Sequence, residues 1–230
     1  MKKLIYLFLT VLIVACSGED NNNDNNSNDE DNNDGDNTVL TCSGDNPVYL
    51  ADNGITIKAC DDANVGDTGV VNGVTYTVVD EAMLRAMVAN EEDVTKVVTT
   101  KVTDMYGMFA GTSFNQPIGD WDVSSVTDMT QMFYESDVFN QPIGNWDVSN
   151  VTSMSFMFNG AESFNQPIGD WDVSKVIDMA CMFKGAESFN KAINNWDVSS
   201  ETYMAGMFWN AKAFNQPIGN WDVSKVKNMS

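Results

Sequence analysis

A repeat of 25 residues constrains this chain more than any other feature. The run FNQPIGDWDVSSVTDM begins at Phe114, and near copies begin at Phe139, Phe164, Phe189 and Phe214. The tryptophans of successive copies are 25 residues apart without exception: Trp121, Trp146, Trp171, Trp196 and Trp221. A fixed period of about 20 to 50 residues indicates a repeat architecture. One copy has too few apolar side chains to offset the entropy of ordering its backbone, so the copies must stack and share a core.

Two apolar spacings within each unit predict a short strand followed by a short helix. The strand pattern consists of Ile118, Trp121 and Val123, which would point inward, whereas Asp122 between them would point outward. The helix pattern consists of Val126, Met129, Met132 and Phe133 at i, i+3, i+6 and i+7. Ser124 is placed to cap this helix. A strand, a helix and two turns therefore account for one period.

The tandem unit resembles that of the BspA-like leucine-rich-repeat surface proteins of bacteria, which reads much like MFNGAESFNQPIGDWDVSKVIDM at residues 157–179. The resemblance covers Val97 to the last residue, and the preceding segment GDTGVVNGVTYTVVDEAML is similar to the lead-in of such proteins. It implies a curved α/β solenoid on a bacterial surface, with adhesion or protein binding as its role and no enzymatic activity. We therefore predict an α/β repeat solenoid of leucine-rich-repeat type, with one short strand and one short helix per coil and a small N-terminal β-hairpin/helix cap.

The first 37 residues predict an export signal and a tether. Residues 1–16 contain two lysines and then an apolar run, Leu4–Val14, that is too short to span a membrane. The run ends in a motif similar to a bacterial lipobox, which predicts cleavage before Cys16 and lipid attachment to it. An ordinary secretory signal with an incidental cysteine is the alternative. Residues 17–37 are rich in asparagine and acidic residues and cannot bury apolar surface, so they predict a disordered tether.

Residues 38–96 predict a capping segment for the array. The runs VYLADNGITIK and GVVNGVTYTVVD each contain an Asn-Gly pair between alternating residues, which predicts two β-hairpins. Asp80 would cap a helix over EAMLRAMVAN that has Met83, Leu84, Met87 and Val88 on one face. Cys42 and Cys60 bracket the first hairpin and would form a disulfide in an exported chain, or else remain two buried thiols. The repeats then occupy residues 97–230, and because the chain stops within the repeat pattern at Met229-Ser230, we expect the array to be truncated.

Three repeated columns have competing structural and functional interpretations. The tryptophans would form the core, or else stack on sugar rings. The asparagines that follow each repeated phenylalanine resemble the buried asparagine ladder of leucine-rich repeats: Asn115, Asn140, Asn165, Asn190 and Asn215. The aspartates of the Asp-Val-Ser triplets would accept backbone hydrogen bonds in Asx turns, or else bind calcium: Asp122, Asp147, Asp172, Asp197 and Asp222.

Specific ligand contacts are expected where the copies differ from one another. The slot after Met-Phe holds Ala110, Tyr134, Asn159, Lys184 and Trp209, and further departures are Phe156 and Tyr203. Aromatic residues are enriched in binding surfaces. The candidate contacts are therefore Tyr134, Phe156, Tyr203 and Trp209, and drift at solvent-facing positions is the alternative. Cys181 also occupies a variable slot and is expected to be a free thiol.

Charge and composition exclude several classes of function. The chain has 33 acidic and 12 basic residues, a net charge of −21, and no histidine. This charge would repel nucleic acid, and the commonest general base and metal ligand is missing. We predict a non-enzymatic protein without a cofactor that binds an extracellular, host or matrix protein or a glycan. It would meet the membrane only through its lipid, as an outer-membrane lipoprotein at the cell surface. The alternative is a purely structural spacer or scaffold for a missing C-terminal region.

Overall fold

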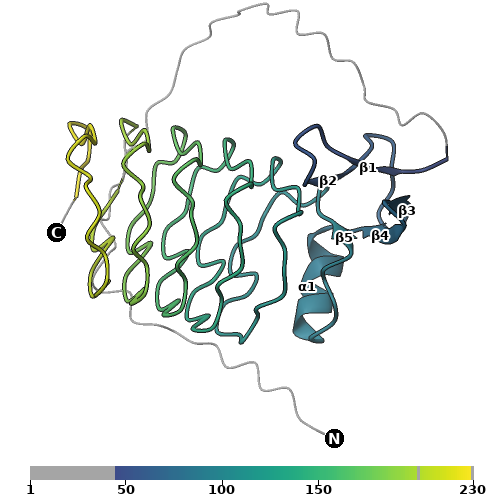
Figure 1. The fold of residues 1–230 in the computed structure, drawn as a ribbon, viewed down its shortest axis with the longest axis horizontal. Helices are drawn as coiled ribbons and strands as arrows, with labels where there is room; N and C mark the ends of the chain where they lie inside the picture. Colours follow the sequence, from purple (N-terminus) through teal and green to yellow (C-terminus); the bar gives the residue numbers. More distant parts are fainter. Residues whose placement is uncertain (1–44, 201–202, 229–230) are drawn as a thin grey trace, which may run out of the picture.

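A small N-terminal region and a row of stacked coils make up the described part of the protein. The computed structural model describes residues 45–200 and 203–228. Successive coils lie side by side in a row that begins next to the N-terminal strands and helix (Figure 1). The predicted signal peptide and Cys16 (residues 1–16), the predicted tether (17–37) and Cys42 lie outside the described residues.

The two predicted β-hairpins are confirmed. β1 (Val48–Leu50) pairs antiparallel with β2 (Ile57–Ala59), and β3 (Thr68–Val71) pairs antiparallel with β4 (Val74–Val78). The second turn has Asn72 and Gly73 at φ values of 52° and 80°, as a two-residue turn with two left-handed residues requires. The short strand β5 (Val97–Val98) adds to β4 in parallel and leads into the first coil.

The predicted helix is also confirmed, as α1 (Glu81–Ala89). The Asp80 side chain accepts a hydrogen bond of 2.8 Å from the N–H of Met83, which caps the first turn. Leu84 is fully buried, and the other members of the predicted face are partly buried against the core of the coils: Met83, Met87 and Val88. The helix therefore covers the open end of the array.

The predicted fold class, an α/β repeat solenoid of leucine-rich-repeat type, is wrong. Among the described residues there is one helix, α1, and no strand follows β5. The coils consist of turns joined by isolated parallel bridges, with Asp104 paired to Asp128, Asp128 to Ser153, Ser153 to Asp178, and Asp178 to Tyr203. A strand and a helix per coil are therefore both absent from the described repeats.

The segment predicted as a helix bonds to the next coil instead of to itself. The N–H groups of Met105, Gly107, Phe109 and Gly111 donate to carbonyls of the following coil, at 2.7–2.9 Å, and the later coils repeat this pattern. An α-helix would direct these donors to carbonyls four residues back in the same segment. The apolar spacing that predicted a helix comes from tight turns instead. In one of them the Met132 N–H donates to the Met129 carbonyl, so two buried methionines lie three residues apart without a helix.

Left-handed residues occur at two positions in each of these segments. The first position has φ between 53° and 61° and holds Gly107, Gln131, Phe156, Cys181 and Gly206. The second has φ between 51° and 74° and holds Gly111, Glu135, Gly160, Gly185 and Asn210. Right-handed helices do not accommodate such residues. The backbone conformation therefore excludes a helix here, whatever the apolar spacing.

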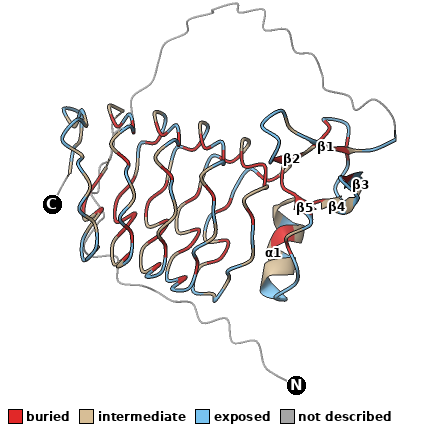
Figure 2. Ribbon diagram, in the orientation of Figure 1, coloured by how far each residue is buried: buried red, intermediate tan, exposed pale blue. Residues whose placement is uncertain are grey.

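Aromatic rings and methionines of successive coils form one continuous core. Four of the repeated tryptophans are 1–3% exposed, namely Trp121, Trp146, Trp171 and Trp196. Each of these indole N–H groups donates to a carbonyl of the preceding turn of chain, as Trp171 does to Ile143 at 3.1 Å. Phe139, Phe164 and Phe189 stack at centroid distances of 5.9–6.0 Å. Buried residues line the inner side of the coils (Figure 2), and the core role predicted for the tryptophans is confirmed, which leaves no exposed ring face for a sugar on these four.

Both described cysteines take part in disulfides. Cys60, predicted to pair with Cys42, is disulfide-bonded, while Cys42 lies outside the described residues. Cys181 is disulfide-bonded as well. The expectation of a free thiol at Cys181 is therefore wrong.

Neighbouring coils approach closely at one position, which holds glycine in four of the repeats and Asn194 in the other. A Cβ built on Gly144 would lie 2.5 Å from the carbonyl oxygen of Pro167 in the next coil, and the equivalent glycines Gly119 and Gly169 meet the same obstacle at 2.6 and 2.5 Å. At Gly219, in the last described coil, a Cβ would meet nothing within 4 Å.

Replacing Gly144 with alanine should therefore lower the free energy of unfolding by about 1–3 kcal/mol, because the added methyl group forces two coils apart. Gly219→Ala is the matched control and should change it by less than about 0.5 kcal/mol. Urea denaturation followed by tryptophan fluorescence measures both. Equal effects of the two substitutions would contradict the close approach of the coils.

Candidate functional site

The bridged segments of the coils combine constant positions with positions that differ from copy to copy. We call these eight-residue stretches the ladder segments: 104–111, 128–135, 153–160, 178–185 and 203–210. Their second, fifth and sixth positions are always Met, Met and Phe, and these side chains face the core. The copies differ at the other five positions. We define the ladder face as the first, third, fourth and seventh positions of the ladder segments, most of which are exposed or partly exposed.

All four predicted contact residues lie on the ladder face, spread over three of the ladder segments. Tyr134 and Trp209 share the seventh position three coils apart, Phe156 is at a fourth position, and Tyr203 is at a first position. Trp209 is 58% exposed, and the other three are half-buried. The structure thus places them on one ladder without gathering them into a single cluster.

Two lysines pack against the aromatic residues of the last complete ladder segment. The Lys184 ammonium lies 4.1 Å from the centroid of the Trp209 ring, and the Lys227 ammonium lies 5.7 Å from that of Tyr203. Cation–π contacts at exposed sites contribute about 0.5–1 kcal/mol. The Lys184 ammonium therefore stabilises the exposed Trp209 ring from one face.

Sequence reasoning missed an exposed tyrosine in the first ladder segment. Tyr106 is 48% exposed, and its hydroxyl donates to Oε1 of Gln131 in the next segment at 3.2 Å. It occupies a third position, which holds small residues in the other coils. The signal that could have revealed it is the alignment of this incomplete first copy with the later ones.

A polar cluster at the centre of the ladder face was also missed. The Thr130 and Ser153 hydroxyls are 2.6 Å apart, and those of Ser153 and Ser155 are 3.4 Å apart. Asp178 continues the row, because its carboxylate accepts a hydrogen bond from Ser155. Asp128 closes the other end and accepts a hydrogen bond of 2.7 Å from the Thr130 N–H.

The Asp178 carboxyl group differs electrostatically from the aspartates of the Asp-Val-Ser triplets such as Asp172. Burial raises the pKa of Asp178 above its ordinary value, and the negative charge of Asp128 adds to the rise. Hydrogen bonds from the Ala180 N–H and the Ser155 hydroxyl act in the opposite direction. The cluster offers both hydroxyl donors and carboxylate acceptors to a polar ligand.

The aspartates of the Asp-Val-Ser triplets form the predicted Asx turns. Oδ1 of Asp172 accepts hydrogen bonds from the N–H and the hydroxyl of Ser174, at 3.0 and 2.6 Å, and the other triplets have the equivalent N–H bond at 3.0–3.2 Å. These turns begin no helix, so the predicted helix cap at Ser124 is wrong. Asp122, predicted to point outward, is only 2% exposed, because Lys58 lies 3.4 Å away and the Thr100 hydroxyl bonds its Oδ2.

In the described part of the chain, no three or more His, Cys, Asp or Glu side chains form a group that could hold a metal ion. The aspartates of the calcium alternative (Asp122, Asp147, Asp172, Asp197 and Asp222) each use Oδ1 for the turn.

The asparagine ladder is present, since the N–H of Asn140 donates to Oδ1 of Asn115 at 3.0 Å and the later coils repeat this bond. It differs from the expected buried ladder because these asparagines are exposed or half-exposed.

The comparisons with known proteins identify a family. The profile of the family described as "Mycoplasma protein of unknown function, DUF285" matches residues 79–180 and 142–230, which together exceed half of the 230-residue chain. The chain belongs to the DUF285 family. The DUF285 match begins just before α1 and includes every ladder segment. No curated protein and no solved structure matches this DUF285 chain. Over its described residues, no helix has the length and apolar character needed to cross a membrane.

The two kinds of aspartate predict opposite effects of pH. Asp172→Asn should lower the free energy of unfolding at pH 7, because the Ser174 hydroxyl and N–H hold the pKa of Asp172 below its ordinary value. A lowered pKa contributes stability above the unfolded-state value, and this contribution is lost as pH falls through the folded-state value. Asp178→Asn should raise the free energy of unfolding at pH 7, because burial raises the pKa of Asp178 and its ionised form costs stability there.

Both differences from the natural protein should shrink below about pH 4, where the carboxyl groups become protonated. Urea unfolding midpoints at pH 7 and at about pH 3 provide the measurement. Shifts of the same sign for the two variants at pH 7 would contradict this assignment.

Proposed function

We propose that this DUF285 protein is a non-enzymatic binding protein, displayed at the cell surface, whose ladder face takes up an extracellular protein or a glycan. One observation carries the proposal. The core positions of the ladder segments are constant, whereas the variable positions present the exposed aromatic residues Tyr106 and Trp209 together with a polar cluster. Large aromatic side chains on a surface are typical of binding sites, and they have no role in the core of this protein.

The chemistry of the ladder face favours a ligand with both flat apolar surface and hydroxyl or amide groups. Aromatic rings provide contact area at a small cost in conformational entropy, and the partly exposed Thr130 and Ser153 provide hydroxyl groups for hydrogen bonds. A glycan or a polar protein loop has both properties. The chain's net charge of −21 disfavours an acidic partner.

The proposed location follows from the first 37 residues. A signal peptide with a lipobox would place lipid on Cys16, and the acidic, asparagine-rich tether would hold the coils away from the membrane. The resemblance to BspA-like leucine-rich-repeat surface proteins supports the same location, the outer membrane of the cell envelope. This part of the proposal rests on sequence alone.

Binding should be lost when the exposed aromatics of the ladder face are removed. The full chain, purified in detergent, is tested by surface plasmon resonance against extracellular-matrix proteins and a glycan array at physiological salt. The Tyr106→Ala/Trp209→Ala double variant should bind at least about tenfold more weakly than the natural chain. Val70→Ala removes an exposed apolar side chain from β3, away from the ladder face, and should leave binding unchanged. If the natural chain is folded and binds none of these ligands, the spacer alternative is favoured and the proposal fails.

Lipid attachment has its own test. Cells expressing the chain are grown with an alkyne-labelled fatty acid, and labelled protein is detected after coupling to a fluorophore. The natural chain should be labelled and remain with the membrane fraction, whereas Cys16→Ala should be unlabelled. Equal labelling of the two chains would show that Cys16 is not the site of attachment.

A further inference from the structure

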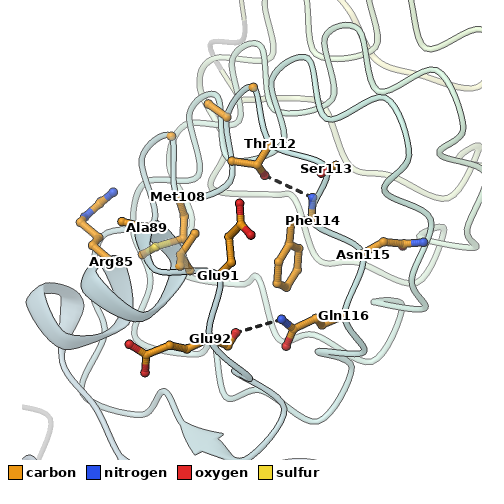
Figure 3. A pocket seen from close by; sticks show the side chains of 14 residues that line it. Arg85, Ala89, Glu91, Glu92, Met108, Thr112, Ser113, Phe114, Asn115 and Gln116 are labelled. Carbon is orange, nitrogen blue, oxygen red and sulfur yellow. Dashed lines mark hydrogen bonds between the residues drawn. The ribbon is translucent and has the colours of Figure 1, made fainter. Parts of the chain in front are cut away.

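A pocket separates the end of α1 from the first coil. Its volume is about 880 Å³, within the range of ligand pockets in general. Val88, Ala89, Glu91 and Glu92 line the helix side. Met108, Phe114, Asn115 and Gln116 line the coil side, where the Phe114 ring lies at the centre of the lining (Figure 3).

The pocket lies where the stack of repeated phenylalanines has its first ring. Phe139 stacks on one ring of this column before it and one after it, and it is fully buried. Phe114 has Phe139 at 6.3 Å on the later side and Phe109 of its own coil at 3.9 Å, and among the described residues no ring precedes it in the column. Phe114 is accordingly only half-buried. One face of the aromatic column is thus available at the pocket.

A backbone donor beside this ring also lacks its usual acceptor. In the four later coils, the N–H that follows the repeated phenylalanine donates to an asparagine Oδ1 of the preceding coil, at 2.9–3.0 Å. The equivalent N–H of Asn115 has no acceptor among the described residues. Asn90 lies one period earlier, but its side-chain amide donates to the Glu92 carboxylate at 3.0 Å.

The hydrogen bonds of Gln116 show that residues before the first coil supply only some of the contacts that a preceding coil would make. Gln116 donates to the Glu92 carbonyl at 2.9 Å and accepts from the Val94 N–H at 2.9 Å. In the later coils the equivalent amides bond to the preceding asparagine, as Gln141 does to Asn115. The segment at Glu92 and Val94 therefore replaces a coil for Gln116, but not for Phe114 or Asn115.

We propose that the pocket binds an extended segment of a partner protein that carries an aromatic residue followed directly by asparagine. Its ring would stack on Phe114, and its asparagine Oδ1 would accept the hydrogen bond from the Asn115 N–H. The same pair of contacts joins the later coils, so the site continues an interface that the protein already uses. The pocket borders the ladder face only at Gly107 and Ala110 of the first ladder segment, away from the polar cluster and Trp209. The inference therefore does not depend on the proposed function.

The acidic residues that line the pocket favour a partner segment with a basic residue. Glu91 and Glu92 carry two carboxylates at the pocket, whereas the lining Arg85 is already engaged by Asp104 at 3.7 Å and by the Tyr106 carbonyl. The Glu91 side chain lies beside the Phe114 ring (Figure 3). A lysine or arginine next to the aromatic residue would therefore strengthen binding, and an acidic residue would weaken it.

Fluorescence polarisation with a labelled peptide, Lys-Ser-Phe-Asn-Gln-Pro, tests the proposal on the full chain. Saturable binding is expected, and replacing either Phe or Asn of the peptide with Ala should weaken it about five- to tenfold. In the protein, Phe114→Leu should weaken binding to a similar extent. Phe214→Leu is the matched control, because it changes the same column in the last described coil, and it should leave peptide affinity unchanged.

Glu91→Gln provides a second variant on an exposed residue, and it should weaken binding of this peptide but not of a version with alanine in place of lysine. The proposal is overturned if the peptide does not bind, or if Phe114→Leu and Phe214→Leu behave alike. It is also overturned if phenylalanine amide alone competes as strongly as the peptide, because the pocket would then recognise a ring without the asparagine.

Discussion

Backbone hydrogen bonds between equivalent positions of neighbouring coils are the interaction on which the rest of this structure depends. Each ladder segment donates alternate N–H groups to the next one, as Phe133 does to Met157 at 2.9 Å. These bonds fix the register at one repeat, so every side chain lies beside its counterpart from the next copy. Buried donors must find acceptors somewhere, and here the neighbouring coil replaces the helix or sheet partner.

This register explains both the constant and the variable residues of the repeat. Identical rings meet identical rings in the core, and the tryptophan N–H groups find carbonyls of the preceding coil, as Trp146 does at Ile118. Four of the five copies have glycine where the coils nearly touch, as at Gly144 beside the Pro167 carbonyl, and the other copy has Asn194. Outer positions of the ladder segments carry none of these constraints, so they are where aromatic and polar groups can change from coil to coil without loss of the core.

The sequence predicted side-chain burial better than backbone structure. Both hairpins, the helix capped by Asp80 and the buried tryptophans follow from local turn chemistry and from the period. The helix predicted at Met129 and Met132 fails because apolar spacing reports which side chains are buried, not which carbonyl each N–H bonds. Left-handed Gln131 and Phe156 carry no sequence signal. Four ladder-face aromatics were found as departures from the repeat, but Tyr106 in the incomplete first copy was missed. The polar cluster needed residues of three coils to be compared along their columns.

The most direct test of the account is a measurement of the hydrogen-bond partner of one backbone N–H in solution. Scalar coupling across hydrogen bonds, detected by NMR in isotope-labelled protein, identifies the carbonyl that accepts from the Phe133 N–H. The ladder predicts coupling to the carbonyl carbon of Met157, 24 residues later in the next coil. Coupling to the carbonyl carbon of Met129, four residues earlier, is the mark of an α-helix and would contradict the account.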